Sequence, residues 1–295
     1  KNFVRIIETH SALAGNIIEN LKFDNGKNLF DEFDAFWSSS LAESLIRGKP
    51  DNESVSLETR ITALSDLVDT TMKPIIFDAD NGGRPEHIPF LISSLERQGV
   101  SAIVMEDKIG LKRNSLFLDQ SKSKQDTIKN FSNKIKIASN SRKYKDFLIV
   151  ARIESLILGR GVKDALRRAI DYSKNGADLI LIHSKDKTPN EIFKFSNLFS
   201  KSKYFKPLIA VPSSYSKTYE RDLSKNNINI VIYANQLLRS SYLAMKKTAL
   251  SILKNKRSFE SEKNISSVKE IINLKWFIFI MINTIDFVKL LIKNK

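Results

Sequence analysis

Residues 74–83 read PIIFDADNGG, and residues 102–115 read AIVMEDKIGLKRNS. Each stretch is a short apolar run that ends at acidic residues: Asp78 and Asp80 follow the first run, and Glu106 follows the second. Carboxylates at the carboxyl ends of successive buried strands converge in space, and three around one point suit a hard cation such as Mg²⁺. Lys112 and Asn114 come shortly afterwards and would face an anion held by that cation. The two stretches therefore predict metal-assisted chemistry on a small anionic substrate.

Similar apolar runs recur along the chain, and segments with helical periodicity separate them. The runs are continuously apolar rather than alternating, as expected for strands buried on both faces. They cover residues 3–7, 35–37, 74–77, 102–105, 147–151, 179–182, 208–211 and 228–233, and the clearest helical segments cover 88–97, 126–138, 162–174, 190–199 and 236–253. Eight strand-plus-helix units predict an α/β fold, a (β/α)₈ barrel of the TIM type. A doubly wound sheet is less favoured, because no glycine-rich dinucleotide fingerprint follows the first run.

Polar residues follow seven of the runs directly, at the end of the strands where such a barrel keeps its active site. One polar strand end would mean little, but seven in register predict a site. The residues are Ser38, Ser39 and Ser40, then Asp78 and Asp80, Glu106, Arg152 and Glu154, His183 and Ser184, Ser213 and Ser214, and Asn235.

The charged candidates also have ordinary structural interpretations. Asp78, Asp80 and Glu106 could cap helices and pair with lysines instead of holding Mg²⁺. Arg152 lies in an otherwise apolar strand, where an unpaired guanidinium would be costly. It could clamp a phosphoryl or carboxylate group through its planar fork, or it could only pair with Glu154. The two interpretations are compatible if Glu154 orients the arginine.

The chain has three histidines, and they differ in their positions. A lone histidine is most often a satisfied core residue, but His183 ends a strand beside Ser184 and Lys185, which favours a role in the site. His10 ends the first run and is ambiguous. His87 begins a helix and is expected at the surface.

A glycine- and proline-containing segment, GKPDNES at 48–54, follows the second run. Its composition is typical of a mobile loop, and a lid carrying Lys49 and Asp51 could close over the substrate and exclude water. The alternative is an ordinary turn. Asp107 and Lys108, next to Glu106, are interpreted as a structural pair outside the site.

Composition narrows the classes of function. The 295 residues contain no cysteine, which excludes a disulfide framework, a thiolate metal site and a cysteine nucleophile, and agrees with a reducing cytoplasm. The formal charge is +15, but lysines and arginines are spread along the chain without a basic block. We therefore expect no nucleic-acid partner. A basic surface could instead steer an anionic metabolite inward.

The two ends of the chain differ from the barrel pattern. The start is no signal peptide, and without an initiator methionine it suggests that upstream residues are missing. Residues 276–292 are strongly apolar but contain Asn283, Asp286 and Lys289, so they are shorter than the ~20 clean residues of a membrane span. We expect a helix that docks on a neighbouring subunit rather than a membrane anchor. The predicted division is a barrel domain at 1–255 and a helical extension at 256–295.

With these residues in view, the chain resembles the phosphoenolpyruvate mutase family of the isocitrate lyase/phosphoenolpyruvate mutase superfamily. The family signature is EDK, five residues, then NS, and it stands intact at 106–115. Further matching segments are DADNGG (78–83), VARIES (150–155), LIHSK (181–185), VPSSY (211–215) and YAN (233–235). The resemblance extends to about residue 274, and the tail beyond it does not look like the family.

The resemblance implies a Mg²⁺-dependent enzyme that interconverts phosphoenolpyruvate and phosphonopyruvate and so opens phosphonate biosynthesis. It implies Asp78 as the main Mg²⁺ ligand, with Asp80 and Glu106 acting largely through metal-bound water. It also implies a carboxylate-binding turn at Trp37, Ser39, Ser40 and Leu41, a phosphoryl grip of Arg152, His183 and Asn114, and loop-gating residues Lys112 and Asp51. Ser213 and Asn235 complete the expected substrate contacts. A homodimer or homotetramer that exchanges C-terminal helices is implied as well.

Two positions depart from the family pattern, and other activities stay open. Ser11 and Ala12 follow His10 where the family often has Asn-Gly, and Gln236 follows Asn235 where a histidine is common. Phosphonopyruvate hydrolase is the nearest alternative, although the KPDN and GLKRNS segments favour the mutase. Lyases of the superfamily use a cysteine in a KKCGH-type loop, which this chain lacks. An oxaloacetate-cleaving relative and a non-catalytic barrel scaffold are the remaining alternatives.

Overall fold

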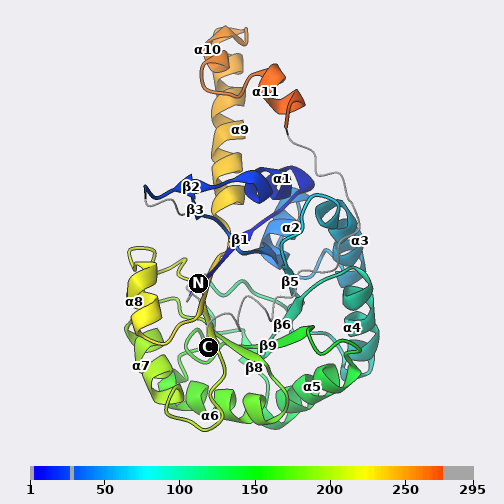
Figure 1. Cartoon of the computed structure of the whole chain (residues 1–295), viewed down its shortest axis with the longest axis vertical. Coiled ribbons are helices and arrows are strands. Elements are labelled where there is room, and N and C mark those ends of the chain that lie inside the picture. Colours follow the sequence, from blue (N-terminus) through cyan, green and yellow to red (C-terminus); the bar gives the residue numbers. More distant parts are fainter. Residues whose placement is uncertain (1–2, 27–29, 118, 275–295) are drawn as a thin grey trace.

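A computed structural model describes residues 3–26, 30–117 and 119–274, and eight of its strands close into a parallel barrel. All eight predicted apolar runs form these strands, most of them shifted by one or two residues. Around the barrel they follow the order of the chain, with the last strand paired to the first (Figure 1). They are β1 (Val4–Glu8), β4 (Ala35–Ser38), β5 (Ile75–Asp78), β6 (Ala102–Glu106), β9 (Leu148–Ile153), β10 (Leu179–Ile182), β11 (Leu208–Ala210) and β12 (Ile230–Tyr233). The predicted (β/α)₈ fold is confirmed.

The strands are apolar on both faces because each face meets a different part of the core. Ile76 of β5 points into the barrel, where it belongs to a cluster with Trp37 of β4 and Val104 of β6. Its neighbours Ile75 and Phe77 point outward into a second cluster formed with the surrounding helices. This alternation follows from the two-residue period of a strand. It explains why the runs are continuously apolar in the sequence.

Helices cover the outside of the barrel (Figure 1). Several begin at a serine or threonine whose side chain accepts a hydrogen bond from the backbone N–H three residues later, as Thr127 does for α5. The helices are α1 (Ala12–Asn20), α2 (Ser40–Ile46), α3 (Leu57–Val68), α4 (Ile88–Arg97), α5 (Ile128–Ser141), α6 (Gly161–Lys174), α7 (Asn190–Phe199) and α8 (Glu220–Lys225), with a 3₁₀ turn at Pro85–His87. A further helix, α9 (Gln236–Asn255), follows the last strand.

Two short antiparallel pairs lie outside the barrel sheet. One joins β2 (Phe23–Asp24) to β3 (Phe30–Asp31). The other joins β7 (Lys108–Ile109) to β8 (Lys124–Gln125) and closes the base of the long loop that follows β6. That loop reaches the carboxyl ends of the barrel strands and carries the predicted residues Lys112 and Asn114.

The helix of the eighth unit leaves the barrel. Figure 1 shows α9 extending away from it, with α10 (Phe259–Glu262) and α11 (Val268–Ile272) at its far end. The predicted extra C-terminal helices are therefore present, while the division at residue 255 and an exchange of helices between subunits stay predictions. The apolar segment 276–292 lies outside the described residues. Within the described part of the chain, no helix is both long and apolar enough to cross a membrane.

Candidate active site

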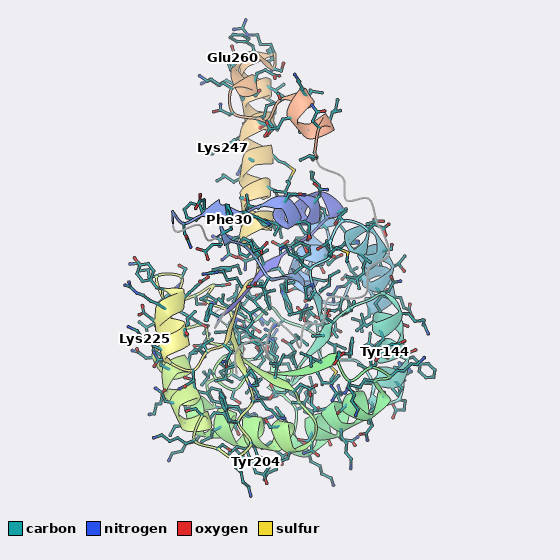
Figure 2. The ribbon with its side chains drawn as sticks, viewed as in Figure 1. Phe30, Tyr144, Tyr204, Lys225, Lys247 and Glu260 are labelled. Carbon is teal, nitrogen blue, oxygen red and sulfur yellow. The ribbon has the colours of Figure 1, made fainter. Side chains whose placement is uncertain are left out.

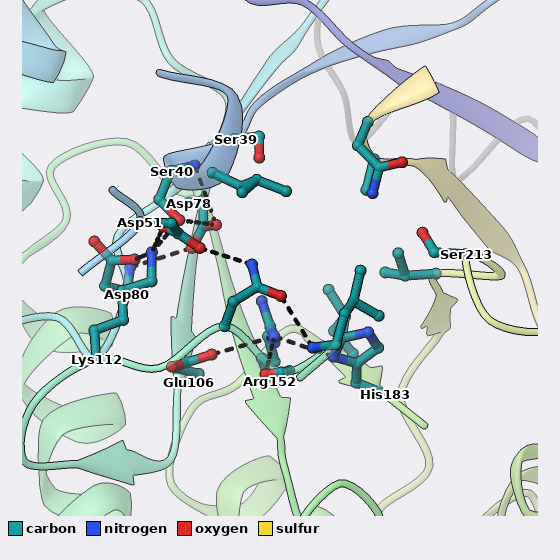
Figure 3. A pocket seen from close by; sticks show the side chains of 18 of the residues that line it. Ser39, Ser40, Asp51, Asp78, Asp80, Glu106, Lys112, Arg152, His183 and Ser213 are labelled. Atoms are coloured by element: carbon teal, nitrogen blue, oxygen red, sulfur yellow. Dashed lines mark hydrogen bonds and ion pairs between the residues drawn. The ribbon is translucent and has the colours of Figure 1, made fainter. Parts of the chain in front are cut away.

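A pocket of about 60 Å³ lies at the carboxyl ends of the barrel strands (Figure 3). All fourteen residues with a predicted role line it, and they come from loops and strand ends far apart in the sequence. They are Trp37, Ser39, Ser40, Leu41, Asp51, Asp78, Asp80, Glu106, Lys112, Asn114, Arg152, His183, Ser213 and Asn235. Their common location is thus established, and their individual roles stay predictions. Ser38, Glu154, Ser184 and Ser214, the other polar residues predicted at the strand ends, are not among the lining residues.

One wall of the pocket is acidic. Asp78 ends β5, and its Oδ2 accepts hydrogen bonds from the Ser40 hydroxyl at 2.7 Å and the Ser40 backbone N–H at 3.3 Å. Asp80 reaches the same wall because its backbone is left-handed, with φ of 53°, and its N–H donates to Asp78 Oδ1 at 3.2 Å. Burial alone would raise the pKa of Asp78, but the charges of Lys112, Arg152 and Arg60 lower it. Asp78 is therefore ionised.

Lys112 joins two loops across this wall. Its Nζ lies 2.5 Å from Asp51 Oδ1, 2.5 Å from Asp80 Oδ1 and 2.6 Å from the Ser40 hydroxyl. Asn114 donates to the other oxygen of Asp51 at 2.7 Å. Burial opposes the charge of Lys112, but the surrounding aspartates raise its pKa above the usual range. The 48–54 segment is thus tied to the loop after β6 at the pocket, beside Asp78 and Asp80 (Figure 3).

The opposite wall is built around Arg152 of β9. Its Nε donates to Glu154 Oε1 at 2.7 Å, and its Nη2 lies 3.3 Å from Glu106 Oε2 and 3.0 Å from the Ser115 hydroxyl. The same Nη2 lies 3.1 Å from His183 Nδ1. Nδ1 also lies 3.2 Å from Glu154 Oε1, so it meets a donor and an acceptor, and these two contacts do not fix the tautomer of the ring. Burial and the charge of Arg152 lower the pKa of His183, which keeps the ring neutral.

Glu154 holds this wall together. Its side chain is fully buried, and the Ser115 hydroxyl donates to its Oε2 at 2.5 Å. The pKa of Glu154 lies well below its usual value, because Arg152, Lys108 and His183 outweigh the effect of burial. Both interpretations of Arg152 are therefore compatible: it pairs with Glu154 and still faces the pocket.

Three residues that matter to the pocket were not predicted. Lys108 was placed outside the site, yet it lines the pocket, with its Nζ 3.4 Å from Glu106 and 2.8 Å from the Ser115 hydroxyl. That interpretation was wrong because the β7–β8 pair turns the lysine inward. Ser115 was quoted only as part of a motif. Arg60 of α3 is buried behind Asp80, 3.4 Å away, with its guanidinium over the Phe77 ring, and nothing in its helical segment distinguishes it from a surface arginine.

Other residues considered for the site lie elsewhere. Lys49 is exposed although Asp51, two residues on, lines the pocket. His10 pairs with buried Glu8 at 2.7 Å and lines a separate groove between α1 and α9. His87 is exposed, as predicted. Asp107 is fully buried behind the pocket, in keeping with its predicted structural role.

The pocket has the donor chemistry for Mg²⁺. Asp78, Asp80 and Glu106 are buried carboxylates in one pocket, and Mg²⁺ prefers hard oxygen ligands and keeps several waters. Within residues 3–26, 30–117 and 119–274, no three acidic or histidine side chains are close enough to enclose an ion by themselves. The residues therefore fit an ion held directly by few carboxylates and otherwise through water. Burial, with the nearby charges of Glu154 and Asp78, raises the pKa of Glu106 to about 7, and a cation would favour its ionised form.

A closed parallel barrel with a charged pocket at the carboxyl ends of its strands is the arrangement of barrel enzymes. The family model described as phosphoenolpyruvate phosphomutase matches residues 1–253. A phosphoenolpyruvate phosphomutase of Tetrahymena pyriformis is 33% identical over 93% of this chain and 87% of its own length. A phosphonopyruvate hydrolase of Variovorax sp. (strain Pal2) is 35% identical over 82% and 83%.

A solved structure of phosphonopyruvate hydrolase in complex with oxalate and Mg²⁺ is also similar. It has a TM-score of 0.80 and 32% identity, and the match covers 92% of this chain and 89% of that one. The chain belongs to the phosphoenolpyruvate phosphomutase family, within the PEP mutase/isocitrate lyase superfamily. The resemblance seen in the sequence is thereby confirmed. Members of the family are enzymes, and a mutase and a hydrolase are similarly close to this chain.

Proposed function

We propose that this chain catalyses the Mg²⁺-dependent interconversion of phosphoenolpyruvate and 3-phosphonopyruvate, the first step of phosphonate biosynthesis. The reaction is an isomerisation, in which a phosphorus–oxygen bond breaks and a phosphorus–carbon bond forms within one molecule. Nothing is added or released. The observation that carries the proposal is the bridge from Asp51 to Lys112 and Asn114, which ties two loops over the pocket.

In this proposal, the two walls of the pocket bind different parts of the substrate. Asp78 is proposed to hold Mg²⁺, with Asp80 and Glu106 contributing through water, and a bound Mg²⁺ would neutralise negative charge on the substrate oxygens. Ser39, Ser40 and Leu41, at the start of α2, are proposed to receive the carboxylate beside Trp37. These residues fix one end of the substrate while the other end reacts.

The opposite wall is proposed to grip the phosphoryl group. Arg152, Asn114 and His183 carry N–H groups, the donors that suit its oxygens. A transferring phosphoryl group passes through a loose, metaphosphate-like transition state, so positioning and charge stabilisation provide most of the catalysis. Because the pKa of His183 is lowered, the neutral ring adds no third full charge beside Arg152 and Lys108.

Exclusion of water separates a mutase from a hydrolase. A metaphosphate-like group that reacts with water becomes inorganic phosphate. If it can react only with the carbon of the pyruvate part of the substrate, it forms the product instead. The Asp51 bridge ties both loops over the pocket, which supports the mutase. The hydrolase is the second candidate, because the Variovorax enzyme is 35% identical.

Phosphorus NMR tests the proposal directly. Purified protein is given phosphonopyruvate and Mg²⁺, and a phosphoenolpyruvate signal is the expected result. Inorganic phosphate with pyruvate would identify a hydrolase instead, and an unchanged spectrum would identify a non-catalytic barrel. A matched sample with excess EDTA should lose the signal, because removing the metal exposes the substrate charge.

The proposal also covers the location, the partners and the oligomeric state of the enzyme. We expect a cytoplasmic enzyme with a small-molecule substrate and no nucleic-acid partner. We also expect a homodimer or homotetramer, because α9 exposes many apolar side chains, among them Tyr242, Leu243 and Met245.

A further inference from the structure

The loop that carries Lys112 and Asn114 has a tightly closed base. It starts after Asp107 and ends before Asp126, and the Asp126 backbone N–H donates to the Asp107 carbonyl at 2.8 Å. Strands β7 and β8 extend this closure by two further pairs, Lys108 with Gln125 and Ile109 with Lys124. We call residues 108–125 the active-site loop. Its outer part reaches Asp51 across the pocket, so its base decides where Lys112 lies.

One side chain of α6 contacts both ends of this base. Arg168 Nη1 donates to Asp107 Oδ2 at 3.1 Å and to the Asp126 carbonyl at 2.9 Å. Its Nε donates to Asp164 Oδ2 at 2.8 Å, which anchors the guanidinium to its own helix. Tyr172, one turn along α6, donates to Asp107 Oδ2 at 2.8 Å. Arg168 is buried at 4% exposure and does not line the pocket.

The same aspartate reaches the phosphoryl-binding wall. Asp107 Oδ1 accepts from the Glu154 backbone N–H at 2.9 Å, and the Asp107 N–H donates to the Arg152 carbonyl at 3.1 Å. Arg168 therefore acts on two parts of the pocket through Asp107. One is the base of the active-site loop, and the other is the backbone that carries Arg152 and Glu154.

A role in stability alone does not account for this arrangement. Burying a guanidinium with carboxylates is often no more stabilising than an apolar replacement of similar volume, because desolvation offsets the attraction. The planar guanidinium has a geometric advantage, because its N–H groups can reach Asp107, the Asp126 carbonyl and Asp164 together. An ammonium could balance the charge but could not hold all three.

We propose that Arg168 is a positioning residue that clamps the base of the active-site loop and thereby keeps water from the transferring phosphoryl group. The inference rests on the proposed function. A looser base lets Lys112 and Asn114 separate from Asp51 more often. Each opening admits water, and the phosphoryl group is then lost as inorganic phosphate.

The test compares Arg168→Lys with Arg167→Lys. The lysine keeps the charge that Asp107 needs but loses the fork, while Arg167 is the exposed neighbour, whose guanidinium pairs with Asp164 at 2.9 Å. For Arg168→Lys we expect the ratio of inorganic phosphate to phosphoenolpyruvate to rise about tenfold, as loss of a charge-assisted hydrogen bond allows. Amide hydrogen exchange in residues 108–125 should accelerate by a similar factor. Arg167→Lys should change neither quantity.

Tyr172→Phe provides a second route if Arg168→Lys does not fold, because it removes one donor to Asp107 without changing charge. Tyr172→Phe should also raise the ratio of inorganic phosphate to phosphoenolpyruvate and the exchange rate of residues 108–125, each by less than Arg168→Lys does. A lowered melting temperature with an unchanged product ratio and unchanged loop exchange would overturn the proposal. If the wild-type protein makes no phosphoenolpyruvate, the proposed function fails, and hydrogen exchange in the variants still decides whether Arg168 clamps the loop.

Discussion

Asp51 contacts both partners from the active-site loop, one with each carboxylate oxygen. Oδ1 lies 2.5 Å from Lys112 Nζ, and Oδ2 accepts from Asn114 at 2.7 Å. In Asp51→Ala both contacts are lost, and we expect turnover to fall at least about a hundredfold, the cost of a misplaced catalytic group. Mg²⁺ binding, measured by calorimetric titration, should stay within a few-fold of wild type, because Asp78 is untouched.

Lys49→Ala is the matched control, since Lys49 belongs to the same segment but is exposed and does not line the pocket. It should keep wild-type turnover. Wild-type turnover in Asp51→Ala as well would reduce the segment to an ordinary turn. Lost Mg²⁺ binding in that variant would instead place Asp51 in the metal site.

The sequence predicts site residues well where their position in a strand decides their direction. Arg152 and His183 were found because polar residues stand at the end of apolar runs. Lys108 was misplaced, because its direction depends on a two-residue strand pair that no periodicity indicates. Arg60 was missed for a related reason: an arginine in a helical segment is usually exposed, and only the packing of α3 shows that this one lies under the pocket.

The turn after β5 depends on glycines that adopt left-handed backbone. Gly82 has φ of 76° and Gly83 has φ of 71°, which alanine resists by about 1–2 kcal/mol. They differ in their surroundings. A Cβ on Gly82 would lie 2.5 Å from Met105 Sδ, whereas one on Gly83 meets nothing within 4 Å. Because Met105 precedes Glu106, the close approach of Gly82 to Met105 places the turn after β5 against the end of β6.

Gly82→Ala should therefore destabilise the protein more than Gly83→Ala does. We expect a further loss of about 1–3 kcal/mol in the free energy of unfolding from overpacking against Met105. Urea denaturation of both variants gives the difference, and the backbone cost cancels between them. Equal stabilities would mean that the methionine side chain moves aside without cost.

At the level of elements, the strands were predictable and the direction of the last helix was not. Each barrel strand is apolar on both faces, because one face fills the barrel and the other meets the helices. Every barrel strand therefore appears in the sequence as a continuous apolar run. The segment at 236–253 has helical periodicity, and α9 does form there, but periodicity does not say against what a helix packs. Its departure from the barrel could not be foreseen from the pattern.

At the scale of the whole molecule, the barrel and α9 differ in how much of their apolar surface they bury. The barrel buries its strands, whereas α9 extends outward, and Leu238 is its one buried residue, all of α9 being within the described part of the chain. Figure 2 shows the side chain of Lys247 on this projecting helix. Leu243, Met245 and Leu253 of α9 are at least half exposed, and Leu13 of α1 is exposed beside it. Exposed apolar side chains on a helix that leaves its own barrel often mark a contact with another protein.

We expect this surface to join copies of the chain. Light scattering of the wild-type protein should give the mass of a dimer or tetramer. The double variant Leu243→Gln/Met245→Gln should raise the dissociation constant at least about a hundredfold, because burying each apolar side chain contributes about 1.5–3 kcal/mol. Lys246→Gln/Lys247→Gln is the matched control, with two polar replacements on the same helix, and should leave the mass unchanged. A monomeric wild-type protein would contradict self-association, and a lysine variant that dissociates equally would show that the contact does not depend on the apolar side chains of α9.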